Sequence, residues 1–175
     1  DGSVRHAASS GGAISALLIE ALNGGLIERV LHVVADTERP TRNIMQWSHN
    51  AAEIIQGAGS RYAASSPLAL VDEALDDGRP FAFVGKPCDI SALRQLALSD
   101  PRVDRQIPLK LSFFCGGLPA YAGADRIIRA MGLEPHEVVA FRYRGNGWPG
   151  MARARTADGR SGEMTYAESW GRHLS

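Results

Sequence analysis

The sequence has no excess of charge of either sign, because its 19 lysines and arginines are matched by 19 aspartates and glutamates. It therefore lacks the global positive field that attracts nucleic acid or an anionic membrane surface. It also lacks any apolar run near the roughly 20 residues that a membrane-spanning helix requires, and no charged segment followed by an apolar signal core opens the chain. We expect no nucleic-acid partner and no membrane span, and any anion site must be local.

Cysteine is scarce, with only Cys88 and Cys115 in the whole sequence. Two cysteines are too few for a disulfide framework, and neither stands in a CxxC motif or another metal-ligand spacing. The five histidines show no metal spacing either. We therefore predict a cytoplasmic protein without a metal site of its own.

Both ends of the sequence suggest a piece of a longer protein. The chain begins at Asp1 rather than at a methionine and stops shortly after Trp170. Its 175 residues, of which 45% are hydrophobic, are enough to bury one substantial core. We therefore interpret the chain as the central part of a longer subunit.

Helix and strand patterns alternate over the first three quarters of the sequence. Apolar residues at three- and four-residue steps predict helices, and continuous apolar runs predict strands buried on both faces. The expected helices cover residues 14–22, 51–56, 67–77, 90–97 and 124–131, and the expected strands cover residues 30–35, 81–84 and 109–114. Gly78 and Gly132 end two of the helices, and Ser66 is expected to cap another.

The pattern changes to a period of two after Pro135. Val139, Phe141 and Tyr143 alternate with Ala140, Arg142 and Arg144, and residues 151–156 alternate again before the turn at Asp158. The expected fold class is therefore α/β, a mixed sheet flanked by helices with an antiparallel C-terminal portion. We divide the chain into an N-terminal α/β part, residues 1–135, and the truncated start of a C-terminal part, residues 136–175.

A small polar segment, Ser9, Ser10, Gly11 and Gly12, comes directly before the first predicted helix. Hydroxyls and unpaired backbone N–H groups at a helix start can hold phosphate. An ordinary serine cap with glycines in the entry turn explains the same residues equally well.

A lysine and a cysteine follow the predicted strand 81–84. Lys86 and Cys88 would stand at the carboxyl end of a buried strand, where open α/β sheets bind ligands, and they are the candidate catalytic pair. The alternatives are that Cys88 is a small buried hydrophobe and that Asp89 is only a helix cap. Cys115 holds the equivalent place after the next strand, unless it packs beside the neighbouring phenylalanines of that strand.

An arginine-rich strand leads into a glycine-rich turn near residue 145. Arg142 and Arg144 would lie on one strand face, with Gly147 and Trp148 in the turn, a group suited to an anionic aromatic ligand. The alternative is a solvent-facing strand edge followed by a hairpin. A polar loop of Ser60, Arg61 and Tyr62 is a further candidate for nucleotide contact.

Five segments of this sequence, taken together and in order, resemble the coenzyme F420 hydrogenase/dehydrogenase beta-subunit family. They are residues 8–12, 59–62, 83–90, 114–119 and 141–150. The resemblance implies an FAD-dependent oxidoreductase subunit that passes electrons between an iron-sulfur centre and coenzyme F420 or another small-molecule hydride acceptor. It implies a redox partner subunit or ferredoxin-like protein, and an iron-sulfur cluster held only with segments outside this chain.

The resemblance also implies roles for the motif residues. Those expected to contact flavin, phosphate or the second cofactor are Ser9, Ser10, Gly11, Gly12, Ser60, Arg61, Tyr62, Arg142, Arg144, Gly147 and Trp148, with Lys86 and Cys88 near the redox centre. Two other functions stay open from the residues themselves. One is a thiol enzyme with Cys88 as nucleophile, and the other is a non-catalytic anion-binding or docking module.

Overall fold

The computed structural model describes residues 2–174 and contains a mixed four-stranded sheet in the order β2-β1-β3-β4. Its strands are β1 (Arg29–Ala35), β2 (Asn43–Ser48), β3 (Phe81–Val84) and β4 (Leu109–Leu111). Strands β1, β3 and β4 run parallel, whereas β2 is antiparallel to β1. The carboxyl ends of the parallel strands therefore meet at one edge of this sheet.

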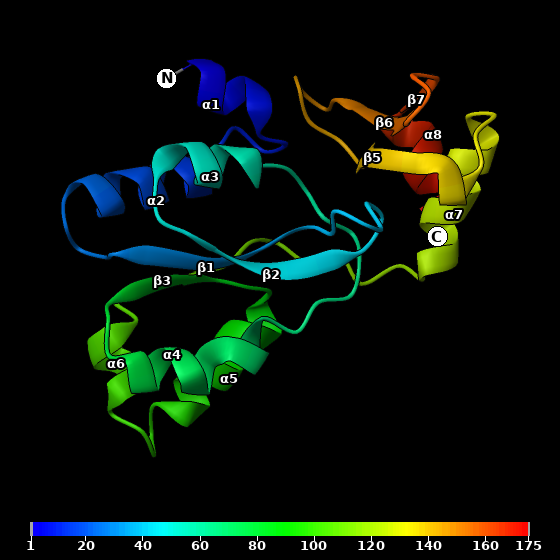
Figure 1. The fold of residues 1–175 in the computed structure, drawn as a ribbon. Helices are drawn as coiled ribbons and strands as arrows, with labels where there is room; N and C mark the ends of the chain where they lie inside the picture. Colours follow the sequence, from blue (N-terminus) through cyan, green and yellow to red (C-terminus); the bar gives the residue numbers. More distant parts are fainter. Residues whose placement is uncertain (1, 175) are drawn as a thin grey trace.

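Helices cover both faces of the four-stranded sheet (Figure 1). One face carries α2 (Ala13–Asn23) and α3 (Ala51–Gln56), and the other carries α4 (Val71–Asp77), α5 (Pro87–Leu96) and α6 (Arg102–Gln106). Alternate strand residues face the two layers. Val30 and Ala82 pack in the core with α2 and α3, while Leu31, Phe81 and Phe83 pack in the core with the other three helices.

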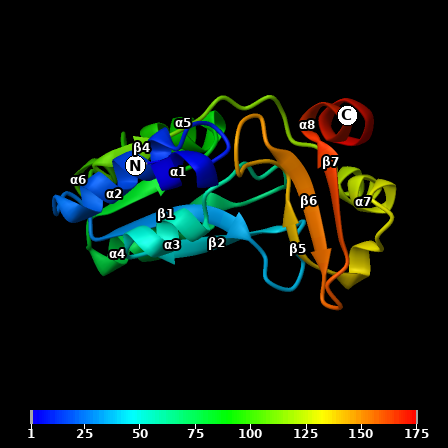
Figure 2. The same ribbon diagram turned by 90° about the horizontal axis from the view of Figure 1, so that it is seen from above.

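A second, antiparallel sheet has the order β5-β6-β7 and lies beside the first (Figure 2). Its strands are β5 (Val138–Arg142), β6 (Met151–Thr156) and β7 (Ser161–Thr165). Helix α7 (Tyr121–Ala130) covers its outer face, and the two alanines Ala152 and Ala154 leave room for Ile127 and Ile128 in their shared core. The arginines of β6 lie on the opposite face of the strand.

Short elements complete the fold. They are α1 (Gly2–Ala7), η1 (Pro67–Leu70), η2 (Pro135–Glu137), α8 (Tyr166–Glu168) and the π-helical turn η3 (Ser169–Leu174). Within residues 2–174 no helix has the length and apolar character needed to cross a membrane.

The expected α/β class with an antiparallel C-terminal portion is confirmed. Each helix expected from the periodicity is present, and Gly78 and Gly132 both adopt the left-handed conformation that ends a helix. Helix α7, which precedes the expected boundary near residue 135, shares the core of the second sheet. The division into residues 1–135 and 136–175 stays a prediction.

Three local expectations were wrong. Strand β4 ends at Leu111 rather than Phe114, because β3 has already turned into α5 and offers no further backbone partner beyond the bond from Gly85 N to the Leu111 carbonyl. Val139 is exposed instead of sharing the buried face of Phe141, because the β5–β6 register shifts between Val138 and Ala140.

The third wrong expectation is the Ser66 cap, since its side chain accepts no hydrogen bond from the following turn. That turn is a 3₁₀ segment that starts at Pro67 and leads into α4. Strand β2 was not expected from the sequence at all. Its polar residues Asn43, Gln46 and Ser48 interrupt the apolar pattern from which a strand is predicted.

Candidate functional site

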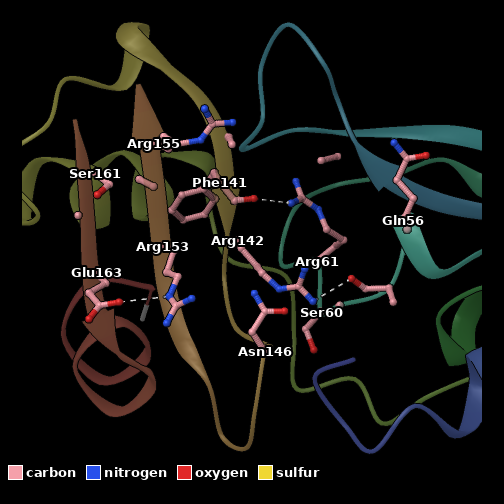
Figure 3. A pocket seen from close by; sticks show the side chains of 17 residues that line it. Gln56, Ser60, Arg61, Phe141, Arg142, Asn146, Arg153, Arg155, Ser161 and Glu163 are labelled. Atoms are coloured by element: carbon pink, nitrogen blue, oxygen red, sulfur yellow. Dashed lines mark hydrogen bonds and ion pairs between the residues drawn. The ribbon is translucent and has the colours of Figure 1, made fainter. Parts of the chain in front are cut away.

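A cavity of about 710 Å³ lies between the first sheet and the inner face of the second (Figure 3). The lining residues are Ala35 at the carboxyl end of β1, Gln56 at the end of α3, residues 57–61 after that helix, residues 140–142 of β5, Asn146, residues 153–155 of β6 and residues 161–163 of β7. This volume falls in the range of about 300–1,000 Å³ that is usual for small-molecule and cofactor sites. The cavity is therefore the candidate functional site.

The loop after α3 forms one wall of the cavity. Asn50 caps the start of α3 by accepting a hydrogen bond from the backbone N–H of Glu53, and Gly57 ends the helix. The loop then reaches Ser60, whose Oγ lies 2.7 Å from Oγ of Ser9. A hydrogen bond between residues 51 positions apart thus ties the cavity wall to the segment before α2.

Arg61 joins this loop to both sheets. Its Nη2 donates to the carbonyls of Pro40 and Arg42, each at 2.7 Å, and its Nε donates to Oδ1 of Asn43 at 2.9 Å. Its Nη1 donates to the Phe141 carbonyl on β5 at 3.3 Å. Because each guanidinium nitrogen already donates to a protein oxygen, Arg61 contributes charge and rigidity to the cavity.

Arg142 reaches across the cavity from β5. Its Nη2 donates to the carbonyls of Ala7 and Ala58, and its Nε donates to the Arg144 carbonyl at 3.1 Å. Gly145 packs directly on this guanidinium, since an added Cβ would lie 2.5 Å from Nη2. No carboxylate among the described residues pairs with Arg142, so its charge is not neutralised by an ion pair.

Two further arginines stand on the inner face of β6, opposite the alanines that pack on α7. Nε of Arg153 lies 3.2 Å from Oε2 of Glu163 on β7, and both side chains are about half exposed. Arg155 lines the cavity, is exposed, and has no hydrogen-bond or ion-pair partner within residues 2–174. Its charge is available to a ligand.

The cavity is electropositive, because four arginines and one glutamate line it. Burial lowers the pKa of Arg61, and the nearby charge of Arg142 lowers it further against an opposing contribution from Tyr143. Burial likewise lowers the pKa of Arg142, with a contribution from Arg153. Guanidinium groups nevertheless stay protonated at neutral pH, so these residues hold mutually repelling charges that an anion would stabilise.

Among the residues expected to contact a cofactor, Ser60, Arg61 and Arg142 line the cavity. Ser9 adjoins it through its hydrogen bond with Ser60.

Ser10, Gly11 and Gly12 do not line the cavity, and Gly12 in a left-handed conformation is the N-cap of α2. Because no side chain caps this helix, the alternative of an ordinary serine cap is wrong.

The other expected contact residues lie outside the cavity lining. Tyr62 packs against Tyr143 and Trp170 in an aromatic cluster. Arg144 donates from Nη2 to the Ser9 carbonyl and lies over the ring of Tyr166.

The remaining two are in the turn after β5. Gly147 donates its N–H to the His6 carbonyl at 3.1 Å, and Trp148 is 82% exposed. The turn contributes Asn146 to the cavity instead.

Lys86 and Cys88 stand at the start of α5 and do not line the cavity. Nζ of Lys86 forms an ion pair with Asp89 at 2.8 Å, and Asp89 accepts a hydrogen bond from the backbone N–H of Lys86. The interpretation of Asp89 as a helix cap is thus confirmed. Cys88 is exposed, which contradicts the alternative of a small buried hydrophobe.

Cys115 is exposed in the segment after β4, which contradicts the alternative that it packs in the sheet. Within residues 2–174 no group of three or more histidine, cysteine, aspartate or glutamate side chains has a metal-binding arrangement. Iron-sulfur clusters are held mainly by cysteine thiolates. The two cysteines of this chain therefore do not fit a cluster by themselves.

Arg153, Arg155 and Glu163 line the cavity although they lie outside the five motif segments, and Asn146 lines it although no role was expected for it within the segment 141–150. The two arginines had a signal in the sequence, because residues 153 and 155 fall on one face of a strand with period two. For Asn146 the only signal in the sequence was its place between two glycines.

Comparisons with known proteins agree with this architecture. Two family models match the chain, one for the N-terminal and one for the C-terminal part of the coenzyme F420 hydrogenase/dehydrogenase beta subunit. The first covers residues 1–72 and the second covers residues 78–173. An uncharacterized protein of Methanocaldococcus jannaschii is 28% identical over an alignment of 141 residues that covers 75% of this chain and 38% of that protein.

A solved structure shares the fold. A chain of the F420-reducing [NiFe] hydrogenase complex from Methanosarcina barkeri matches with a TM-score of 0.70 and 19% identity over 98% of this chain and 59% of that chain. This chain thus spans less than two thirds of either relative. The family resemblance seen in the five motifs is confirmed, because the two family models together cover nearly the whole sequence: the chain belongs to the coenzyme F420 hydrogenase/dehydrogenase beta-subunit family.

Proposed function

We propose that this chain is the flavin-binding part of an oxidoreductase subunit and that FAD binds in the cavity between the two sheets. The single observation that carries the proposal is the excess of arginine in a cavity of cofactor size. A dinucleotide flavin combines a planar ring with two phosphates, and arginine pairs well with phosphate oxygens.

Several residues of the cavity fit such a ligand. Arg155, which has no partner within the described residues, and Arg153, whose pair with Glu163 is exposed, would contact the phosphates. The glycines of the loop 57–59 allow close approach of a ligand to the backbone. Arg61 and Arg142, held in place by carbonyl oxygens, would contribute fixed positive charge.

When bound, FAD would supply the capacity for hydride and single-electron transfer. The protein's own share is positioning and electrostatics. Fixed guanidinium charges in a partly buried site favour the negatively charged form of a nearby group, because the charges are already oriented and cost no reorganisation. The cavity arginines would therefore favour a reduced, anionic ring.

The family and the fold neighbour suggest the wider reaction. The solved relative is part of an F420-reducing hydrogenase complex, so we propose that a redox partner subunit or ferredoxin-like protein delivers electrons. Coenzyme F420 or another small hydride acceptor would receive them. Any iron-sulfur centre would need cysteines from outside this chain, since the described residues form no metal-binding group.

The proposal is tested by titrating the purified protein with FAD and following the quenching of flavin fluorescence. We expect binding that weakens with rising salt, because phosphate–arginine contacts are screened by ions. Excess pyrophosphate should compete. A protein that leaves FAD fluorescence unchanged at every salt concentration would contradict the proposal.

A second measurement separates the redox subunit from the two other functions. The FAD-loaded protein is reduced photochemically and then mixed with coenzyme F420, whose visible absorption is lost on reduction. Transfer supports the redox subunit, whereas FAD binding without transfer to any partner supports a docking module. Turnover of a substrate that is lost in Cys88→Ser without any need for FAD would favour the thiol enzyme.

A further inference from the structure

The turn between β5 and β6 contains a non-glycine residue in the left-handed conformation. Asn146 has a φ of 56° and is the one such residue in the described part of the chain. Its neighbours Gly145 and Gly147 have φ values of 128° and 114°. Glycine adopts positive φ at no steric cost, whereas a residue with a Cβ is strained there, although asparagine tolerates it better than most.

The position of Asn146 is held by its surroundings. Gly147 donates its N–H to the His6 carbonyl at 3.1 Å, which ties the turn to α1. Gly150 packs on Gly145 so closely that an added Cβ would lie 2.5 Å from the Gly145 nitrogen. The backbone at residue 146 is therefore constrained, and so is the direction of its Cα–Cβ bond.

The side chain of Asn146 lines the same cavity as those of Arg142 and Ser60 (Figure 3). Its amide has no hydrogen-bond partner within residues 2–174. An exposed amide offers one acceptor oxygen and two donor hydrogens. These groups are available to a ligand in the cavity.

We infer that Asn146 is a specificity-determining residue that hydrogen-bonds the uncharged polar edge of a ring carrying a carbonyl next to an N–H. This inference rests on the proposed flavin site and adds which part of the ligand the turn contacts. A phosphate presents only acceptors and is matched by the arginines, whereas a carbonyl beside an N–H is matched by an amide that both donates and accepts. Glycine would fit the backbone better, so the turn alone does not explain the asparagine.

The test compares Asn146→Gly and Asn146→Asp with the unmodified protein. Glycine removes the amide and relieves the left-handed strain, while aspartate keeps the size and the tolerance of positive φ but loses both donors. The midpoint of thermal unfolding shows whether each substitution changes the stability of the turn. Binding is titrated with FAD, with riboflavin, which has the ring but no phosphate, and with pyrophosphate, which has no ring.

We expect Asn146→Gly to unfold at the same or a higher temperature and to bind FAD and riboflavin about five- to tenfold more weakly, as the loss of a hydrogen-bonded amide implies. Its affinity for pyrophosphate should not change. Asn146→Asp should also weaken riboflavin binding. Both results together would support the inference.

Two outcomes would overturn the inference while leaving the flavin site intact. One is riboflavin binding by Asn146→Gly that equals that of the unmodified protein. The other is a parallel loss of pyrophosphate binding, which would show that the substitution disturbs the whole cavity. If the unmodified protein binds neither FAD nor riboflavin, the proposed function itself fails.

Discussion

The imidazole of His32 lies directly against the backbone of Gly57, and a Cβ added at Gly57 would stand 2.5 Å from Cε1 of that ring. His32 is buried in β1, and its Nε2 lies 2.7 Å from Oγ of Ser48 on β2. The ring therefore has little room to move. The contact lies where α3 ends, because Gly57 is the C-cap of that helix.

Gly57→Ala is expected to destabilise the protein by about 1–3 kcal/mol, because the new methyl group overpacks the contact with the buried His32 ring. Urea denaturation measures the change in the free energy of unfolding. Gly116→Ala is the matched control, since nothing lies within 4 Å of its Cβ position, and it should change the stability by less than about 0.5 kcal/mol. Equal free energies of unfolding for the two variants would show that the His32 ring moves aside at little energetic cost.

His32 should make the stability fall in mild acid. Burial lowers the pKa of His32 from 6.5 to about 4. In the unfolded chain His32 is therefore protonated below pH 6.5, whereas in the folded protein it is protonated only below about pH 4. Stability is therefore full above the unfolded pKa and decreases as the pH falls toward the folded pKa, by on the order of 2–3 kcal/mol.

The control for this prediction is His32→Gln, which keeps a polar group near Ser48 but does not titrate. Unfolding by urea is measured from about pH 7 to about pH 4 for both proteins, the range over which the histidine contribution changes. Carboxylates titrate alike in both, so the difference between the two curves reports His32. Parallel curves over this range would contradict the assignment.

Arg61→Lys is expected to destabilise the protein by about 2–4 kcal/mol even though the charge is kept, because a single ammonium group cannot replace the guanidinium's several hydrogen bonds. Arg61 donates from three nitrogens to four oxygens, of which two lie in the loop before β2, one in β2 and one in β5. Arg94→Lys on the exposed face of α5 is the control. A similar unfolding midpoint in urea for the two variants would mean that the Arg61 network contributes little.

Arg155→Ser should weaken FAD binding without affecting folding. The side chain has no partner within residues 2–174, so its removal should change the stability by less than about 0.5 kcal/mol. We expect a loss of about three- to tenfold in FAD affinity and a smaller dependence on salt, because one charged contact is removed. Arg94→Ser, which lies outside the cavity lining, should bind FAD like the unmodified protein.

The two phenylalanines Phe83 and Phe114 should respond very differently to truncation. Phe83 is fully buried between β3 and the helices below it, whereas Phe114 is fully exposed. Phe83→Ala should cost about 3–5 kcal/mol of stability, and Phe114→Ala should cost almost none. Thermal unfolding compares them, and a large loss in Phe114→Ala would show that this segment packs against the protein.

Much of the fold was predictable because its signals are local. The helices follow from apolar residues at three- and four-residue steps and from glycines such as Gly78 that end them, and the buried strands follow from uninterrupted apolar runs. Two of the three errors occurred where a neighbouring strand decides the outcome. Strand β4 stops early for want of a partner, and the bulge near Val139 belongs to the pairing with β6.

The site was predictable only in part for the same reason. Ser60, Arg61 and Arg142 were expected and line the cavity, but Lys86 and Cys88 do not. Both groups belong to motifs of the family. Their separation depends on which loops of the two sheets face each other, and no short-range pattern reports that.

The sequence by itself determined the α/β class, the strand-to-helix corners and the family, because each of these depends on residues close together in the chain. The tertiary structure alone decided that Arg142 meets the Ala58 carbonyl, 84 positions away, and that Asn146 and the β6 arginines share their cavity. Contacts over such separations arise from the packing of two sheets side by side, and packing is a property of the assembled surfaces.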